Sequence, residues 1–397
     1  MKYDRLKVLC LDKEGGYGGS SRSLFQSIKH ISSSEIDVEV WCKRRGPIQE
    51  RYQTINVRTE VHPNMPSYHS LPKISRNLFA LTVFFIYDWP QSFFFRRKLL
   101  EKVNKVDVIH LNIDGFYWLS RWLGKRTDTP IVMHKRTNPW VSIFSRFQMK
   151  IIARYVSRLV FITEENEKNY VKLGGKANHG VVIYNITPQI DKLPEPLKDI
   201  PNDNRFKVCT LANYSYLRGI DRLIDVAKII KDSSFNKVLF VVAGNISLTR
   251  SLPGELGKVA KSGGNLSDYA KKMGVDDMFT FLGHVNNPER VLSGCNVLIR
   301  PSRENNPWGR DVLEALSFGI PVIATGTYNR FVDNEITGFL LGRFNPSIVA
   351  EKIVMLSNDY HLVEHLGIQG RERVTRLCNG PKCAKDLLNI WQEVSKQ

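Results

Sequence analysis

Short apolar runs alternate with amphipathic stretches along this sequence, and the alternation occurs in two similar halves. In the first half the apolar runs occupy residues 6–12, 37–42, 107–111, 130–134, 159–163 and 181–184. In the second half they occupy residues 206–212, 238–243, 278–282, 296–300 and 320–324, with helical patterns over 219–231, 266–273 and 310–318. Apolar strands separated by helices indicate parallel sheets that are covered on both faces. A chain of 397 residues is long enough for two such α/β domains.

A segment rich in proline and charged residues, 187–204, separates the two halves. We therefore predict two doubly wound, Rossmann-like domains that face a central cleft, one over residues 1–190 and one over residues 204–378. We also expect a C-terminal helix over residues 382–397 that packs back on the first domain. Ligands of such sheets bind outside the carboxyl ends of the strands, so the loops that directly follow strands are the most informative ones.

The chain carries a formal net charge of +18, and most of the excess lies in its first 200 residues. Such an excess suits nucleic acid, an anionic membrane or an anionic substrate. The sequence contains no helix-turn-helix, zinc-finger or RNP-type motif, so we expect no nucleic-acid partner. Scattered cysteines and an N-terminus unlike a signal peptide predict a cytoplasmic protein with reduced thiols and no metal site. These cysteines are Cys10, Cys42, Cys209, Cys295, Cys378 and Cys383.

Two stretches favour contact with a membrane surface. In the first, basic residues recur every four positions beside aromatic and aliphatic ones. These residues are Arg146, Lys150, Arg154 and Arg158, beside Trp140, Phe144, Phe147 and Ile151. On a helix the pattern fits either an interfacial helix or a core-packed helix with a solvated basic edge. The second stretch, residues 78–98, is interrupted by Asp88 and Pro90 and is too short to span a bilayer, so we expect peripheral contact only.

Three loops that follow strands carry candidate ligand-binding groups. The glycine-rich loop at residues 15–20 lets backbone N–H groups approach an anion at a helix N-terminus. It lacks the G-x-G-x-x-G pattern, which disfavours a nicotinamide-dependent dehydrogenase. In the second loop, Arg218 precedes Gly219 at the start of a helix and suits a phosphate. In the third loop, residues 301–325, Glu314 lies one turn into a helix, where a carboxylate suits the hydroxyls of a ribose.

The third loop, PSRENNPWGRDVLEALSFGIPVIAT, resembles the nucleotide-sugar signature of the retaining glycosyltransferases of family 4. The family pattern matches here at Pro301, Ser302, Gly309, Glu314, Ala315, Gly319, Pro321 and Val322. Similar stretches occur in the family's order at the glycine-rich loop, at the strand before His110, over residues 159–185 and over residues 336–341. The resemblance implies the GT-B fold. It also implies transfer of a sugar from a nucleotide-diphosphate donor with retention of anomeric configuration, without an essential metal or a cofactor.

The resemblance assigns roles to individual residues. It implies that Glu314 binds the donor ribose, that Arg218 replaces a lysine on the diphosphate, and that Gly16 lies against the donor phosphate. His134 resembles the family's histidine near the transferred sugar. We accordingly expect His134, Arg218 and Glu314 to act in catalysis. The residues expected to bind the donor are Gly16, Asn213, Arg218, Asn306, Trp308, Gly309, Arg310, Asp311 and Glu314.

Two positions depart from the family pattern. Asn306 stands where the family has a glutamate that binds sugar hydroxyls, and Asn213 stands where it has an arginine. An amide still donates and accepts hydrogen bonds, so Asn306 keeps the site usable and is expected to alter the choice of donor. Glu304 is the alternative group for the sugar hydroxyls, and Arg303 or Arg310 is the expected replacement for the missing cation.

These features favour a retaining glycosyltransferase that acts at the inner face of the plasma membrane. We expect its acceptor, a glycan or a lipid-linked molecule of lipopolysaccharide, O-antigen or capsule synthesis, to bind the basic first domain. The leaving phosphate would take the acceptor proton, so no protein nucleophile is assigned. The alternatives are a catalytically weak or non-catalytic relative that binds polyanions or membranes, and a phosphorylase or epimerase of the same fold.

Overall fold

A computed structural model describes residues 5–16, 18–71, 74–187, 193–235 and 237–396. Linker residues 188–192 lie outside this description. They include residues 188–190, the end of the predicted first domain. The chain forms two compact units. The first comprises Met1–Ile186 together with Cys378–Gln397, and the second comprises Thr187–Leu377.

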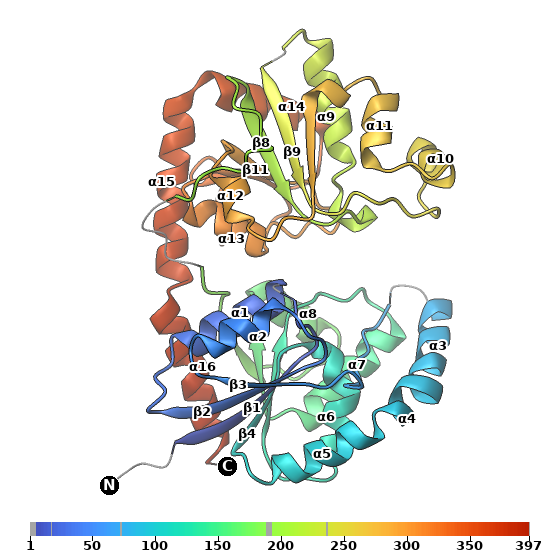
Figure 1. Ribbon diagram of the computed structural model, residues 1–397, viewed down its shortest axis with the longest axis vertical. Coiled ribbons are helices and arrows are strands. Elements are labelled where there is room, and N and C mark those ends of the chain that lie inside the picture. The colour runs from blue at the N-terminus through green and yellow to red at the C-terminus, as the bar shows by residue number, and fades with distance from the viewer. Residues whose placement is uncertain (1–4, 17, 72–73, 188–192, 236, 397) are drawn as a thin grey trace. The chain divides into compact units, whose positions relative to one another are not determined.

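The first unit contains a seven-stranded parallel sheet in the order β3-β2-β1-β4-β5-β6-β7 (Figure 1). Its strands are β1 (Leu6–Asp12), β2 (Ile36–Cys42), β3 (Arg58–Val61), β4 (Val108–Leu111), β5 (Ile131–Lys135), β6 (Arg158–Phe161) and β7 (Gly180–Val182). Successive side chains of a strand point to opposite faces, so β1 sends Val8 and Cys10 into one core and Leu9 and Leu11 into another. Both faces of this sheet are therefore buried, as the continuous apolar runs predict.

Helices cover both faces of this sheet. One core includes side chains of α1 (Gly19–Lys29), α2 (Pro47–Gln53) and the C-terminal α16 (Gly380–Val394). The other core includes side chains of α5 (Phe93–Val103), α6 (Tyr117–Leu123), α7 (Ile143–Tyr155) and α8 (Glu164–Lys172). Helix α16 packs against α1 and β6, and thus joins the end of the described chain to the first unit (Figure 1).

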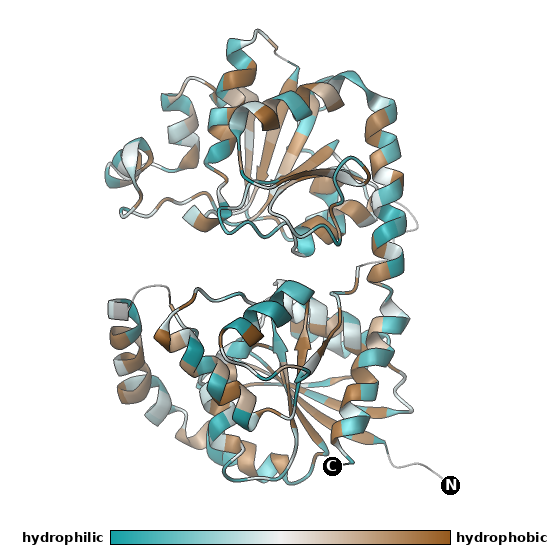
Figure 2. Ribbon diagram, turned by 180° about the vertical axis from the view of Figure 1, so that it is seen from behind, coloured by the Kyte–Doolittle hydropathy of each residue, from teal (hydrophilic) through white to brown (hydrophobic). Residues whose placement is uncertain are grey.

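The second unit repeats this architecture with a six-stranded parallel sheet in the order β10-β9-β8-β11-β12-β13. Its strands are β8 (Phe206–Leu211), β9 (Val238–Ala243), β10 (Phe279–Gly283), β11 (Val297–Arg300), β12 (Val322–Thr325) and β13 (Gly338–Leu341). Its helices are α9 (Arg222–Asp232), α10 (Gly254–Lys261), α11 (Leu266–Lys272), α12 (Glu289–Leu292), α13 (Arg310–Ser317), α14 (Pro346–Asn358) and α15 (Tyr360–Leu377). The strands of both sheets are coloured mainly as hydrophobic in Figure 2. The two Rossmann-like α/β halves predicted from the sequence are thus confirmed.

Three local predictions require correction. The edge strands β3 and β13 were not predicted as strands. Each is four residues long and is paired on one side only. The helix predicted over residues 219–231 begins at Arg222, because Gly219 adopts a left-handed conformation with φ of 73° after the short 3-10 helix Tyr216–Arg218. The basic helix ends at Tyr155, so Arg158 lies in β6 and pairs with Glu393 at 3.3 Å.

The apolar stretch before α5 forms α3 (Ile74–Val83), a π-helical turn (Phe84–Asp88) and α4 (Trp89–Gln91). In the described part of the chain, no single helix is long and apolar enough to cross a membrane. The segments Ser75–Gln91 and Phe93–Val103 reach that length and composition only as a pair, and they are bent by 64° relative to each other.

Candidate functional site

The predicted donor-binding loop begins at the carboxyl end of β11. The last residue of that strand, Arg300, is buried, and its Nη1 donates to Asp311 Oδ1 at 2.7 Å. Its Nε donates to the backbone oxygen of Asn306 at 2.8 Å. A Cβ at Gly309 would lie 2.4 Å from Asp311 Oδ1 and 2.8 Å from Arg300 Nη1, so a larger residue there would displace this ion pair. Arg300 thus holds the loop from inside, a role that we did not predict, although a basic residue at the end of an apolar strand is a usable signal.

The two candidate groups for the sugar hydroxyls are bonded to each other. Asn306 Nδ2 donates to Glu304 Oε2 at 3.2 Å, and Asn306 Oδ1 accepts from Arg300 Nη2 at 3.2 Å. The asparagine that replaces the family's glutamate therefore lies between a carboxylate and a guanidinium. Both groups stay candidates for the sugar hydroxyls, and binding there would exchange one of these hydrogen bonds for a bond to the ligand.

Glu314 lies on the buried side of α13 and is only 5% exposed. Its Oε1 accepts from Arg310 Nη2 at 2.9 Å and from Arg310 Nε at 3.1 Å, one helical turn away. Arg310, one of the two expected replacements for the missing cation, is therefore engaged with the carboxylate that is expected to bind ribose. Trp308, which precedes the helix, is also buried.

The loop after β8 and the loop after β11 are tied together. Arg303 Nη1 donates to Asp221 Oδ1 at 2.9 Å, and its guanidinium lies 3.9 Å from the ring centroid of Tyr216. Arg222 Nη1 donates to the backbone oxygen of Pro301 at 3.1 Å. Gly219 permits this approach, because a Cβ there would lie 2.1 Å from the Pro301 oxygen. Arg303, the other expected replacement cation, therefore braces the two loops against each other.

Arg218 belongs to the loop after β8, one of the two loops that Arg303 and Arg222 tie together. Its side chain is exposed, yet desolvation of the guanidinium lowers its pKa, and the charge of Arg300 lowers the pKa further. Asp311 and Glu304 act in the opposite direction, so all of these charges lie near one another. Asn213 does not join this group through its amide oxygen, which accepts from the backbone N–H of Asn245 at 2.8 Å. Arg218 thus supplies exposed positive charge at this edge of the sheet, whereas the charge of buried Arg300 is paired with Asp311.

In the first unit the glycine-rich loop follows β1. Gly16 is exposed and has no atom within 4 Å of an added Cβ. The tight position is Gly15, where a Cβ would lie 1.8 Å from the backbone oxygen of Arg44. The structure therefore leaves space beside Gly16 for a ligand, and it explains the glycine at position 15 by the close approach of a neighbouring loop.

His134 lies near the carboxyl end of β5 and is 4% exposed. Its Nδ1 is 2.7 Å from His110 Nε2, and His110 Nδ1 accepts from Trp391 Nε1 at 2.9 Å. Burial lowers the pKa of both imidazoles, that of His110 to about 3, and the charge of Arg136 adds to the effect. Both rings are therefore neutral at neutral pH.

Other polar residues gather at the same edge of the sheet and were not predicted. Arg136 donates to Asn112 Oδ1 at 2.7 Å and to Asn185 Oδ1 at 3.1 Å. Asp12, the last residue of β1, is fully buried, and burial raises its pKa. Asn112 and Arg136 directly follow strands and Asp12 ends one, and that position was the available signal.

A buried lysine lies beside this group. Lys135 ends β5 with no exposed surface, and its Nζ donates to the backbone oxygen of Thr137 and lies 3.9 Å from Asp114 Oδ2. Burial lowers the pKa of Lys135 to about 8, while Asp114 opposes the shift. In the described ranges of the chain, no group of three or more His, Cys, Asp or Glu residues is placed to hold a metal ion.

The basic stretch that we linked to membranes is a partly buried helix with an exposed flank. Ile151 packs into the core, whereas Arg146, Lys150 and Arg154 are exposed. Phe147 joins this flank to α3–α5, because its ring lies 5.7 Å from that of Trp118, which in turn lies 4.9 Å from that of Phe85. We call the exposed apolar residues of α3–α5 and of the start of α7 the aromatic surface. They are Leu78, Phe79, Val83, Phe85, Ile86, Tyr87, Phe93, Phe94, Trp140, Val141, Ile143 and Phe147.

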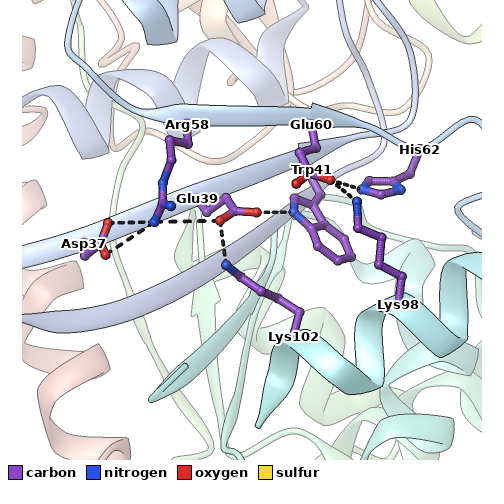
Figure 3. Close-up of polar contacts among 8 residues, drawn as sticks. All are labelled: Asp37, Glu39, Trp41, Arg58, Glu60, His62, Lys98 and Lys102. Atoms are coloured by element: carbon purple, nitrogen blue, oxygen red, sulfur yellow. Dashed lines mark hydrogen bonds and ion pairs between the residues drawn. The ribbon is translucent and has the colours of Figure 1, made fainter. Parts of the chain in front are cut away.

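A polar network fixes α5, and with it part of the aromatic surface, to the edge of the sheet (Figure 3). Buried Glu39 of β2 accepts from Lys102 of α5 at 2.6 Å and from Trp41 Nε1 at 2.6 Å. One turn earlier on α5, Lys98 donates to Glu60 of β3 at 2.5 Å. The Lys102–Glu39 pair is largely buried and the Lys98–Glu60 pair lies at the surface, and together they tie α5 to β2 and β3.

Comparison with known proteins defines the class of the chain. Residues 17–187 match the family described as Glycosyltransferase Family 4, and residues 195–373 match the family described as Glycosyl transferases group 1. Together these matches span most of the sequence. The chain therefore belongs to these glycosyltransferase families.

Individual glycosyltransferases and solved structures are similar to this chain. The capsular polysaccharide biosynthesis glycosyltransferase CapM of Staphylococcus aureus is 28% identical over 231 residues, which cover 57% of this chain and 54% of CapM. The chain spans about half the length of the curated relatives it matches. The crystal structure of Anabaena HepE in complex with UDP-glucose aligns at a TM-score of 0.75 and 18% identity, over 98% of this chain and 100% of HepE. Sucrose-phosphate synthase from Thermosynechococcus elongatus aligns at a TM-score of 0.71 and 17% identity, over 98% of this chain and 99% of the synthase. The GT-B fold is thereby confirmed.

Proposed function

We propose that this protein transfers a sugar from a nucleotide-diphosphate donor to a glycan or lipid-linked acceptor in the synthesis of a surface polysaccharide, such as a capsule, lipopolysaccharide or O-antigen. The observation that carries the proposal is the grouping of Arg218 with the Arg300–Asp311 pair at the carboxyl edge of one parallel sheet, with the buried carboxylate of Glu314 on the helix whose first turn contains Asp311. The relationship to CapM supports polysaccharide synthesis, and the HepE complex supports UDP as the nucleotide.

The chemistry of these groups suits a retaining transfer without an essential metal. Arg218 and the N-terminal amides of α13 balance the charge that develops on the leaving diphosphate, as preorganised donors do, while Arg300 and Asp311 hold the loop in place. Glu314 accepts hydrogen bonds from the ribose hydroxyls. The leaving phosphate takes the acceptor proton on the face from which it departs, so that no side-chain nucleophile is required.

A panel of nucleotide sugars tests this function. Thermal shift identifies the donor, because a ligand that binds only the folded state raises its stability. Turnover is then followed with a short glycan acceptor, with and without EDTA, and NMR of the product reports the anomeric configuration. Inversion, or loss of turnover in EDTA that added metal restores, would contradict the proposed mechanism. Donor binding without any turnover would favour the non-catalytic alternative, and phosphate-dependent cleavage would favour a phosphorylase.

We also propose that the protein acts at the cytoplasmic face of the plasma membrane, with the aromatic surface against the bilayer. Phe94 is 77% exposed at the start of α5, and Phe79 is 73% exposed on α3, a helix that is rich in hydrophobic residues (Figure 2). The exposed Arg146, Lys150 and Arg154 lie on α7, the helix that also carries Phe147 of the aromatic surface, and suit anionic headgroups. Each basic residue near such a surface contributes on the order of 1 kcal/mol, and salt screens the attraction.

Liposome co-sedimentation tests the membrane contact. Wild-type protein should bind anionic vesicles and should be released by moderate salt. Charge reversal by Arg146→Glu and Lys150→Glu should abolish binding, while the matched reversal Lys261→Glu and Lys271→Glu in the second unit should not. Binding that persists in high salt on neutral vesicles would instead indicate insertion of α3–α5. Absence of binding to either vesicle would refute the proposal.

A further inference from the structure

A chain of hydrogen bonds runs from the C-terminal helix to the predicted active-site histidine. Trp391 of α16 is fully buried, and its Nε1 lies 2.9 Å from His110 Nδ1. His110 Nε2 lies 2.7 Å from His134 Nδ1. The three rings belong to α16, β4 and β5, and the outer two are 257 positions apart in the sequence.

The chemistry of the indole determines which atom donates in each of these hydrogen bonds. An indole N–H only donates, so His110 Nδ1 must accept and carries no proton. Because the His110 ring is neutral, its proton lies on Nε2 and is donated to His134 Nδ1. His134 Nδ1 is then the acceptor, which leaves the single proton of the neutral His134 ring on Nε2. The orientation of one tryptophan thus determines the tautomer of two histidines.

The proton of His134 lies on the ring nitrogen that faces away from His110. Within the described ranges of the chain, the imidazole makes its hydrogen bond through Nδ1, to His110. Nε2 is the other ring nitrogen, in a residue that keeps 4% of its surface exposed. His134 thus offers one directed N–H group at the carboxyl edge of the sheet.

We infer that Trp391 is a positioning residue, which acts through His110 to hold His134 as an Nε2–H donor to an oxygen of a ligand at the carboxyl edge of the first sheet. The identity of that ligand rests on the proposed function. In this tautomer His134 donates a hydrogen bond to a sugar hydroxyl or phosphate oxygen and does not act as a general base. The reach of α16 back to β4 thereby contributes to the site itself as well as to the packing of the first unit.

Replacement of the indole tests the inference. In wild-type protein labelled with ¹⁵N-histidine, long-range ¹H–¹⁵N spectra should show His110 and His134 as single Nε2–H tautomers. In Trp391→Phe the donor is lost, so His134 should appear as a mixture of tautomers and turnover should fall roughly threefold to tenfold, as for the loss of one hydrogen bond. Val394→Ala on the same helix is the control, because it weakens packing and leaves the indole in place.

Two variants of His110 keep the test decisive if Trp391→Phe folds poorly. A glutamine side chain can accept from Trp391 with its oxygen and donate to His134 with its nitrogen, so His110→Gln should preserve the tautomer of His134 and most of the turnover. His110→Leu should lose both. A proton on Nδ1 of wild-type His134, or equal effects of Gln and Leu, would overturn the inference. Nε2–H tautomers in a protein that transfers no sugar would instead refute the proposed function and leave the tautomer assignment intact.

Discussion

Replacement of Glu314 by alanine addresses the donor site most directly. The carboxylate is 5% exposed, and its Oε1 accepts two hydrogen bonds from Arg310 within the same helix. If Glu314 also accepts from the ribose hydroxyls, alanine removes a charged acceptor from a nearly dry position. Hydrogen bonds to charged groups contribute about 1.5–3 kcal/mol, which corresponds to a rise of roughly 12-fold to 150-fold in the Kd of the nucleotide.

The same substitution affects stability by a separate amount. Removal of one partner of a fully buried ion pair costs about 3–5 kcal/mol. Arg310 keeps 11% of its side chain exposed, so we expect a smaller loss of about 1–3 kcal/mol in the free energy of unfolding. Glu314→Gln should lose less of both quantities, because its amide oxygen still accepts from Arg310 and from a hydroxyl.

Two measurements separate these effects. Calorimetric titration with UDP, or with the nucleotide that thermal shift identifies, gives the Kd, and urea unfolding gives the stability. Glu364→Ala on α15 removes an exposed carboxylate and should change neither quantity. If Glu314→Ala loses stability but binds the nucleotide with unchanged Kd, Glu314 serves only as the partner of Arg310 and the assignment to ribose is wrong.

Two further predictions concern the cations. Arg218→Ala should lower kcat at least tenfold and Arg218→Lys much less, because a point charge still meets a diphosphate; equal losses in steady-state assays would contradict the assignment. Lys135 releases its proton near pH 8 in the folded protein and near 10.5 when unfolded. The unfolded state therefore binds more protons between these values, and the stability of wild type relative to Lys135→Met should rise by up to about 3 kcal/mol over that window. Below pH 8 both states are protonated and the difference should be constant. A difference that is independent of pH from 7 to 10.5, measured by urea unfolding, would show that the lysine is not desolvated.

The sequence pattern predicts the core strands well because each is a continuous apolar run, as in VLFVVA of β9. It fails at β3, because the residues RTEV include three polar side chains and one valine at the edge of the sheet and resemble a loop. Glu314 was predicted from its place in the signature, and its pairing with Arg310 follows from a spacing of four residues on one helix. The sequence was therefore sufficient to predict the Arg310–Glu314 pair, although we did not predict it.

Other parts of the candidate site depend on contacts that no local pattern contains. Arg303 meets Asp221 across 82 positions, and Trp391 meets His110 across 281. Such pairs are fixed by the order of strands and by the path of the chain between the units. The sequence of each partner alone is equally consistent with a solvated charge or an ordinary core aromatic.

The path of the chain has a consequence for biosynthesis. Helix α16 covers one face of the first sheet, yet the ribosome makes it only after all of the second unit, Thr187–Leu377. The first unit therefore keeps part of its apolar core uncovered until the whole of the second unit has been synthesised. Interrupted synthesis between Leu377 and Trp391 would release a chain whose second unit is intact and whose first unit exposes Val8, Val108 and their neighbours to water. Nascent-chain quality control acting on this protein would thus encounter the exposed apolar core in the first unit, which is synthesised before the second.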